Sequence, residues 1–221
     1  MQNVFSICTR FPGKREKPMN KQNSTIMKLA ETALLAALCY VSFTFLQIKI
    51  PVPGGDATSL HIGNTFCVLG ALLLGGWYGG LAGSIGMTIA DLMDPVYITG
   101  APKTFVLKLC IGLITGLVAH KIAKINETND KKYVFKWSLI ASIAGLAFNV
   151  IADPIVGYFY KQYILGQPQE VASILAKLSD GATFVNAIVS TILVVIIYNA
   201  VRPALIKANL IHVYVTAANA K

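Results

Sequence analysis

Residues 61–93 read HIGNTFCVLGALLLGGWYGGLAGSIGMTIADLM. This block is apolar along most of its length, and the glycine cluster at 75–80 is its clearest interruption. A helix that spans a bilayer needs about 20 apolar residues. If the glycines break the block, it holds two helices that cross a membrane in opposite directions, and otherwise it holds one. The number of spans, and with it the fold, depends on this break.

The rest of the chain is as apolar as this block. Of its 221 residues, 55% are hydrophobic and 13% are charged, and the mean hydropathy is +0.61, which is too apolar for an ordinary soluble domain. With the block divided, the apolar runs predict six membrane-spanning helices and leave little room for a soluble domain. The predicted helices are 27–47, 61–75, 77–93, 104–123, 136–160 and 182–203.

The distribution of basic residues favours the divided block. The chain has 19 Lys and Arg against 10 Asp and Glu. Six spans with a cytoplasmic N-terminus place 14 of the 19 in cytoplasmic segments and five outside, in agreement with the positive-inside rule. One undivided helix would move the five lysines of residues 120–136 outside. We therefore predict an all-α membrane protein with six transmembrane helices and cytoplasmic N- and C-termini.

The chain is expected to form one membrane domain with two tails. Residues 27–207 make up the six-helix domain, and residues 208–221 are a cytoplasmic tail. Residues 1–26 are basic and lack the apolar core of a signal peptide, which predicts a disordered cytoplasmic tail. Because surplus Lys and Arg mark cytoplasmic loops in a membrane protein, the net charge of +9 does not indicate a nucleic-acid partner.

Polar side chains inside the predicted spans are candidates for function, because burying them in lipid is costly. The helix directions place them together near the outer surface, whereas the cytoplasmic half has almost none. This predicts a small-molecule pocket open to the outside rather than a path through the membrane. The polar residues gathered there are His61, Asn64, Asp91, Asp94, Lys108, Asn149, Asp153 and Asn186.

Several of these residues also have a structural interpretation. Asp94 and Asp153 each precede a proline, which could end or kink the helix. Asp91 could pair with Lys108 as a buried structural ion pair. The two asparagines at the outer ends of the last spans could hydrogen-bond between helices. The residues alone leave both interpretations open.

The predicted outer loop between the first two helices reads IPVPGGDATSL over residues 50–60. Two prolines stiffen its start and two glycines let it bend. Above the predicted pocket it could act as a lid that closes on a solute, or it could be a plain connection. The predicted lid residues are Pro53, Gly54, Gly55 and Asp56.

Small residues suggest two helix contacts. Ala33 and Ala37 lie four residues apart near the cytoplasmic end of the first helix, a spacing that lets another helix approach closely in lipid. That other helix could belong to a partner or to this chain. The glycines of the third helix are expected to pack the bundle tightly.

Sequence motifs for catalysis are absent. The chain contains no GxxxxGK[ST] nucleotide-binding loop, no HExxH, no GxSxG and no metal-ligand cluster. We therefore expect no enzyme, no metal and no cofactor in this chain.

Together these features resemble one family of transport proteins, over residues 27–207. The resemblance is to the S component, the substrate-binding subunit, of energy-coupling factor (ECF) vitamin transporters. It is carried by the basic N-terminus, the Ala33-xxx-Ala37 spacing, the Pro-Gly outer loop, the glycine-rich second and third helices ending in ADLMDP at 90–95, Tyr97, APKTF at 101–105 before Lys108, and YNAVRPAL at 198–205.

This resemblance implies a subunit that binds a water-soluble vitamin at the outer face of the bacterial plasma membrane. It would dock through Ala33 and Ala37 on a membrane coupling subunit, which is driven by two cytosolic ATPase subunits that use ATP. Pyridoxine or hydroxymethylpyrimidine is favoured, with riboflavin next, and the alternative function is an ion-coupled secondary transporter of a small polar solute. The implied substrate-binding residues are Asp91, Lys103, Lys108, Asn149, Asp153 and Asn186.

Overall fold

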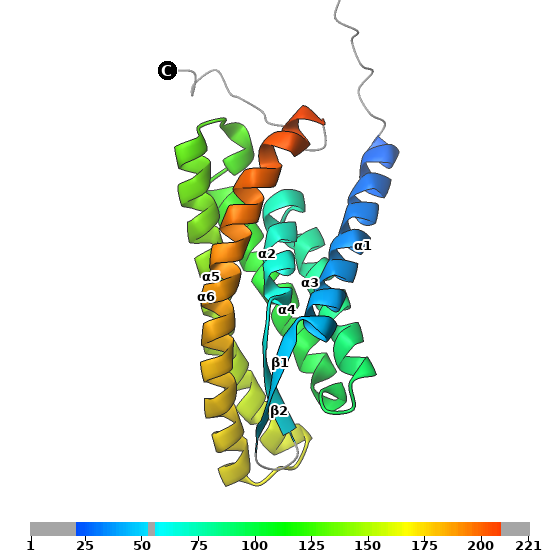
Figure 1. Ribbon diagram of the computed structural model, residues 1–221, viewed down its shortest axis with the longest axis vertical. Helices are drawn as coiled ribbons and strands as arrows, with labels where there is room; N and C mark the ends of the chain where they lie inside the picture. The colour runs from blue at the N-terminus through cyan, green and yellow to red at the C-terminus, as the bar shows by residue number, and fades with distance from the viewer. Residues whose placement is uncertain (1–20, 53–55, 209–221) are drawn as a thin grey trace, which may run out of the picture.

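A computed structural model describes residues 21–52 and 56–208 of the chain. Six α-helices and one β-hairpin make up most of this part (Figure 1). The elements are α1 (Lys21–Phe45), β1 (Gln47–Val52), β2 (Asp56–His61), α2 (Gly63–Leu74), α3 (Gly76–Met93), α4 (Ala101–Gly116), α5 (Lys131–Phe159) and α6 (Gln169–Lys207). Short π-helical turns at Leu117–Ile122 and Tyr160–Ile164 extend α4 and α5, and 3-10 turns lie at Ile98–Gly100 and Ile125–Glu127.

The predicted break in the 61–93 block is confirmed at Gly75. This residue separates α2 from α3 and has a φ of 95°, a conformation that favours glycine because other residues are strained there. α2 and α3 then pack against each other so closely that a Cβ on Gly79 would lie 2.0 Å from the Ala71 nitrogen. The glycine cluster therefore makes both the turn and the contact that follows it.

Four of the six helical segments are long and apolar enough to cross a membrane: 25–45, 98–127, 131–164 and 169–207. At 1.5 Å per residue, α2 with its 12 residues extends about 18 Å and α3 with its 18 residues about 27 Å. α2 is thus shorter than the roughly 30 Å thickness of a bilayer core. It is preceded directly by β2, so the chain reaches α2 as a strand.

Two segments differ from the predicted loops. Residues 47–61 form an antiparallel hairpin, with Gln47 opposite His61 and Val52 opposite Asp56, so the chain is not entirely helical. α6 begins at Gln169, whereas the sequence predicts the last helix only from residue 182. The early start of α6 is supported by Ala172 and Leu175, which are buried against the rest of the molecule.

The predicted role of the third-helix glycines in packing is confirmed where α3 crosses α4. Gly76 and Gly80 of α3 meet Gly112 and Gly116 of α4, each pair spaced by four residues. A Cβ on Gly112 would lie 2.2 Å from the Gly80 Cα, and one on Gly116 would lie 2.1 Å from the Gly76 nitrogen. Backbone approach of this kind is the usual consequence of small-xxx-small spacing in membranes. It holds together the two helices that carry Asp91, Lys103 and Lys108.

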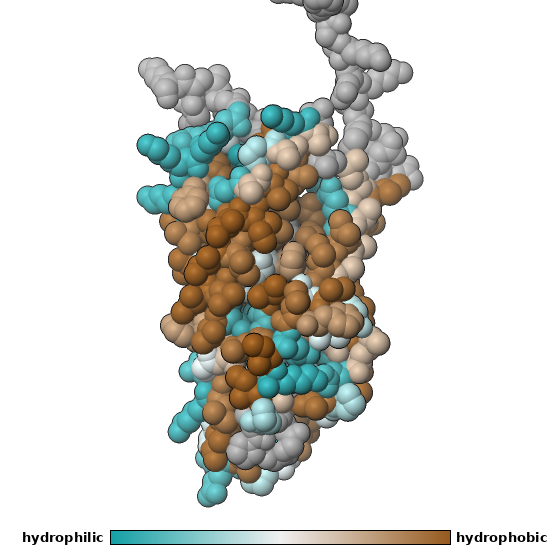
Figure 2. Space-filling model, viewed as in Figure 1, coloured by the Kyte–Doolittle hydropathy of each residue, from teal (hydrophilic) through white to brown (hydrophobic). Residues whose placement is uncertain are grey.

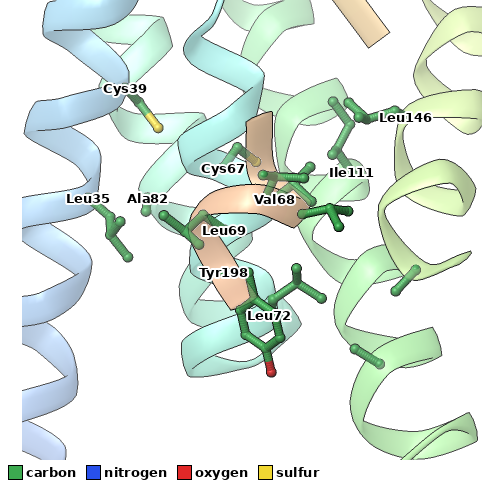
Figure 3. Packing of buried hydrophobic residues seen from close by; sticks show 14 of the residues in the cluster. Leu35, Cys39, Cys67, Val68, Leu69, Leu72, Ala82, Ile111, Leu146 and Tyr198 are labelled. Carbon is green, nitrogen blue, oxygen red and sulfur yellow. The ribbon is translucent and has the colours of Figure 1, made fainter. Parts of the chain in front are cut away.

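Apolar side chains form both the interior and the exterior of the bundle. Inside, residues of all six helices pack around Val68 and Leu72 of α2 (Figure 3). Outside, Figure 2 shows a broad hydrophobic band across the middle of the visible face, with hydrophilic groups above and below it. Ile188, Ile192 and Ile196 of α6 are each about half exposed. Exposed apolar surface of this extent fits contact with lipid.

The two ends of the bundle differ in charge and structure. α1 begins and α6 ends at one end, near the α4–α5 connection, and the hairpin lies toward the other (Figure 1). The first end, called the basic end below, carries Lys28, Lys121, Lys124, Lys131, Lys132, Lys136, Arg202 and Lys207 among the described residues. The other end is called the hairpin end.

Candidate functional site

A cavity of about 290 Å³ lies at the hairpin end, bounded by β2 and by α2 to α6. Its lining includes all six residues predicted to bind substrate: Asp91 of α3, Lys103 and Lys108 of α4, Asn149 and Asp153 of α5, and Asn186 of α6. Helices far apart in the sequence thus bring these side chains to one cavity. Whether each of them contacts a substrate stays a prediction.

Asp153 is the centre of a hydrogen-bonded cluster on one wall. Its Oδ1 accepts from the Lys103 Nζ at 2.9 Å, and its Oδ2 accepts from the Ser179 Oγ at 3.0 Å and from the Thr183 Oγ1 at 2.9 Å. Both charged side chains are less than one-fifth exposed. The following Pro154 lies inside α5 and does not end it. Asp153 is therefore an organising group of the pocket rather than a helix terminator.

Lys108 lies deeper than this cluster and is 9% exposed. No carboxylate oxygen of the described residues comes within 4.0 Å of its Nζ, so the alternative of an Asp91–Lys108 contact pair is not seen. Asp91 is 3% exposed and lies beside Thr104. The cavity therefore holds a buried ammonium group without a direct counter-ion in this part of the chain.

Two buried amide oxygens beside the cavity also lack a partner among the described residues. The Oδ1 atoms of Asn149 and Asn64 are buried and have no hydrogen-bond partner among the described residues, and both residues line the cavity. Buried polar atoms in proteins are nearly always hydrogen-bonded, so such atoms beside a cavity indicate groups that a ligand or water would satisfy. Asn64 was noted in the sequence as a polar residue at this level but was not among the six.

Asn186 is engaged differently from the other two asparagines. Its Oδ1 accepts from the His61 N–H at 3.0 Å, and its Nδ2 donates to the Ser59 carbonyl at 2.9 Å. His61 in turn accepts at Nδ1 from the Gly63 N–H at 3.2 Å, and its ring contacts Phe43 edge-on at 4.7 Å between centroids. The contact of Asn186 is thus with strand β2, not with another helix.

The hairpin forms the remaining wall. Ala57, Thr58, Ser59 and His61 line the cavity, and Lys49 of β1 pairs with Asp94 just after α3. Pro95 follows Asp94 at the end of α3, as one of the two interpretations expected. Of the predicted lid residues, Pro53, Gly54 and Gly55 lie outside the described residues, and Asp56 is described only as the first residue of β2.

Sequence reasoning missed Ser179 and Thr183, although a signal for them was present. With Asn186 they follow a spacing of four and three residues, which places them on one face of a helix. Residue 179 lies before the predicted start of the last helix at 182, so the sequence did not place it on one helix face with Asn186.

Ala33 and Ala37 lie on the outside of α1. Both are exposed, whereas Leu35, Ala36 and Cys39 are buried against the bundle. The contact of α1 with α3 is made by Ala36, whose carbonyl oxygen would be 2.2 Å from a Cβ on Gly86. The Ala33–Ala37 stripe is therefore not used for packing among the described residues.

The half of the bundle toward the basic end, which was predicted to be cytoplasmic and to have almost no polar groups within the helices, contains several buried polar side chains. Arg202 is 7% exposed and donates from Nη2 to the carbonyls of Ile125 at 2.9 Å and Thr128 at 3.1 Å. The His120 ring bonds the Ala71 carbonyl at 3.0 Å. The expectation of almost no polar groups there was wrong, because these side chains satisfy backbone carbonyls at helix ends and in the α4–α5 connection.

Comparisons with known proteins agree with this architecture. No curated protein sequence matches the chain. The structure is similar to that of ThiT from Listeria monocytogenes, with a TM-score of 0.60 and 20% sequence identity over 83% of this chain and 98% of that one, which shows a shared fold. The sequence profile of a family described as "ECF-type riboflavin transporter, S component" matches residues 23–203. This chain therefore belongs to the family of ECF-type S components, the substrate-binding subunits of membrane transporters.

Proposed function

We propose that this S component captures a water-soluble vitamin at the outer face of the bacterial plasma membrane and delivers it through an ATP-driven coupling module. The observation that carries the proposal is the cavity at the hairpin end, where the buried Oδ1 atoms of Asn149 and Asn64 have no hydrogen-bond partner among the described residues. A ligand with complementary hydrogen-bonding groups would satisfy them, which gives affinity and selectivity together.

The proposed orientation places the hairpin end outside and both termini in the cytoplasm, with all six helices embedded. The concentration of Lys and Arg at the basic end supports it through the positive-inside rule. In this arrangement α2 reaches only part of the way through the bilayer, and β2 completes its path at the outer side. The cavity is then open to the solution that holds the vitamin.

For the substrate we propose a nitrogen heterocycle with hydroxyl groups. The cavity of about 290 Å³ is at the lower end of the usual range for ligand pockets, ~300–1,000 Å³, which favours a single ring such as pyridoxine or hydroxymethylpyrimidine. The description of the matched family supports riboflavin as the next candidate. Lys103 is already neutralised by Asp153, whereas Lys108 has no carboxylate oxygen of the described residues within 4.0 Å and would be available to an electron-rich ring nitrogen or oxygen.

For the partners we propose a membrane coupling subunit and two cytosolic ATPase subunits. The exposed Ala33 and Ala37 support a docking face on α1, since small side chains let a partner helix come close. ATP would be used by the partner subunits, and this chain would carry no cofactor of its own.

The test is native mass spectrometry and equilibrium binding on the purified chain in detergent, with pyridoxine, hydroxymethylpyrimidine, riboflavin and other water-soluble vitamins as separate ligands. We expect one of them to bind to wild type, and Asn149→Ala to weaken that binding at least about tenfold, because the amide contact is lost. Gly181→Ala, on a part of α6 where a Cβ meets nothing within 4 Å, is the matched control and should bind as wild type. Retention of no vitamin by wild type would refute the proposal.

A further inference from the structure

The side-chain amide of Asn186 pairs with β2 in the way that a neighbouring strand would. It accepts from the His61 N–H and donates to the Ser59 carbonyl, at 3.0 and 2.9 Å. In a strand, the N–H and C=O of alternate residues point to the same side. β1 occupies one edge of β2, so the amide takes up the edge that β1 leaves free.

An unpaired strand edge inside a membrane protein is costly, because lipid offers its N–H and C=O groups no partner. Asn186 is 6% exposed, and Ser59 and His61 are 8% and 9% exposed. Loss of the amide would leave a buried donor and a buried acceptor unsatisfied. These two hydrogen bonds are therefore expected to fix the position of β2 on α6.

The same face of α6 fixes a second wall of the cavity. Ser179 and Thr183, which precede Asn186 by seven and three residues, both donate to Asp153 of α5. One stripe of α6 thus holds the α5 wall through a carboxylate and the β2 wall through an amide. Asn64 of α2 and Asn149 of α5, in contrast, line the cavity with Oδ1 atoms that have no hydrogen-bond partner among the described residues.

We propose that Asn186 is a positioning residue: it fixes β2, and with it Thr58, Ser59 and His61, as a wall of the binding cavity and does not itself contact the vitamin. This inference rests on the proposed function for its effect on binding, but the contact between Asn186 and β2 can be tested without ligand. Asn149 provides the comparison, since it lines the same cavity and makes no hydrogen bond to the described residues of the hairpin.

The experiment combines amide hydrogen exchange at His61 in ligand-free protein with vitamin affinity. In Asn186→Leu, we expect the His61 amide to exchange at least about tenfold faster and the vitamin to bind at least about tenfold more weakly. In Asn149→Ala, we expect the affinity to fall while exchange at His61 stays as in wild type. Asn186→Asp keeps an oxygen that can accept from His61, so it should retain most of the protection and bind more tightly than Asn186→Leu.

Unchanged exchange at His61 in Asn186→Leu would overturn the proposal, and with weakened binding it would identify Asn186 as a substrate contact instead. Exchange in the α3–α4 crossing serves as the folding control, and should be the same in all variants. If wild type binds no vitamin, the proposed function fails, whereas the His61 exchange still decides whether Asn186 holds β2.

Discussion

Substitution of Gly112 by alanine is expected to force α3 and α4 apart. The added Cβ would lie 2.2 Å from the Gly80 Cα and 2.3 Å from the Gly80 nitrogen, whereas ordinary contacts of this kind are 3.4–4 Å. The helices would have to separate by about 1 Å or more, because backbone atoms, unlike a side chain, cannot rotate away. Overpacking costs ~1–3 kcal/mol, and backbone against backbone places this case at about 3 kcal/mol.

Gly181→Ala is the matched control for this substitution. Gly181 is also a helical glycine, but a Cβ there meets nothing within 4 Å, so alanine should stabilise the chain by ~0.5–1 kcal/mol through its better helix propensity. The two variants should thus differ by roughly 4 kcal/mol, nearly a thousand-fold in the folding equilibrium. The assay is reversible denaturant unfolding in detergent without vitamin. Equal stability of Gly112→Ala and Gly181→Ala would refute the close crossing of α3 and α4.

Two further predictions concern the exposed face of α1 at Ala37 and the Lys49–Asp94 pair of the hairpin. Ala37→Trp should abolish vitamin uptake in cells and leave the affinity of the purified chain for the vitamin within about twofold of wild type. Ile188→Trp replaces an exposed side chain of α6 and should change neither uptake nor affinity. Loss of vitamin binding in Ala37→Trp would mean that Ala37 packs inside the chain. For the Lys49–Asp94 pair, partial burial raises the pKa of Asp94, but the hydrogen bond and charge of Lys49 outweigh it, so the folded pKa lies below the unfolded value of about 3.9. The pair then stabilises the hairpin at neutral pH and loses this effect as the pH falls through the folded pKa. Wild type and Asp94→Asn should therefore differ in unfolding midpoint at pH 7 and converge at pH values below the folded pKa of Asp94, whereas a constant difference would contradict this.

The helical part of the fold could be predicted because its signals are local. A run of apolar residues and the glycine at 75 are read directly from the sequence, and the structure confirms the break between α2 and α3. The hairpin was missed because its prolines and glycines are equally typical of a loop, and its strands are only six residues each. The start of α6 was missed because Glu170, Lys177 and Asp180 resemble a surface segment, whereas burial of Leu175 is a tertiary effect.

For the site, too, the sequence predicted which residues gather but not which residues they contact. Depth along each helix follows from residue number at 1.5 Å per residue, and this was enough to bring Asp91, Lys108 and Asn149 to one cavity. Partners of each group could not be predicted, because they come from contacts between distant segments. Asn186 hydrogen-bonds to residues more than 120 positions earlier in the chain. Asp153 pairs with Lys103 of α4 rather than with the more deeply placed Lys108.

The proposed docking face on α1 is connected to the cavity through the packing of α1 against α3. The exposed stripe of α1 at Ala33 and Ala37 lies next to the buried face that carries Ala36. The carbonyl of Ala36 packs against α3 at Gly86. Five residues further along α3, Asp91 lines the cavity. Because close-packed backbones transmit displacement without side-chain slack, a partner helix that presses on α1 acts on the same helix that carries Asp91. Under the proposed function, Gly86 therefore lies between the two surfaces that the subunit would have to coordinate, the docking face and the cavity.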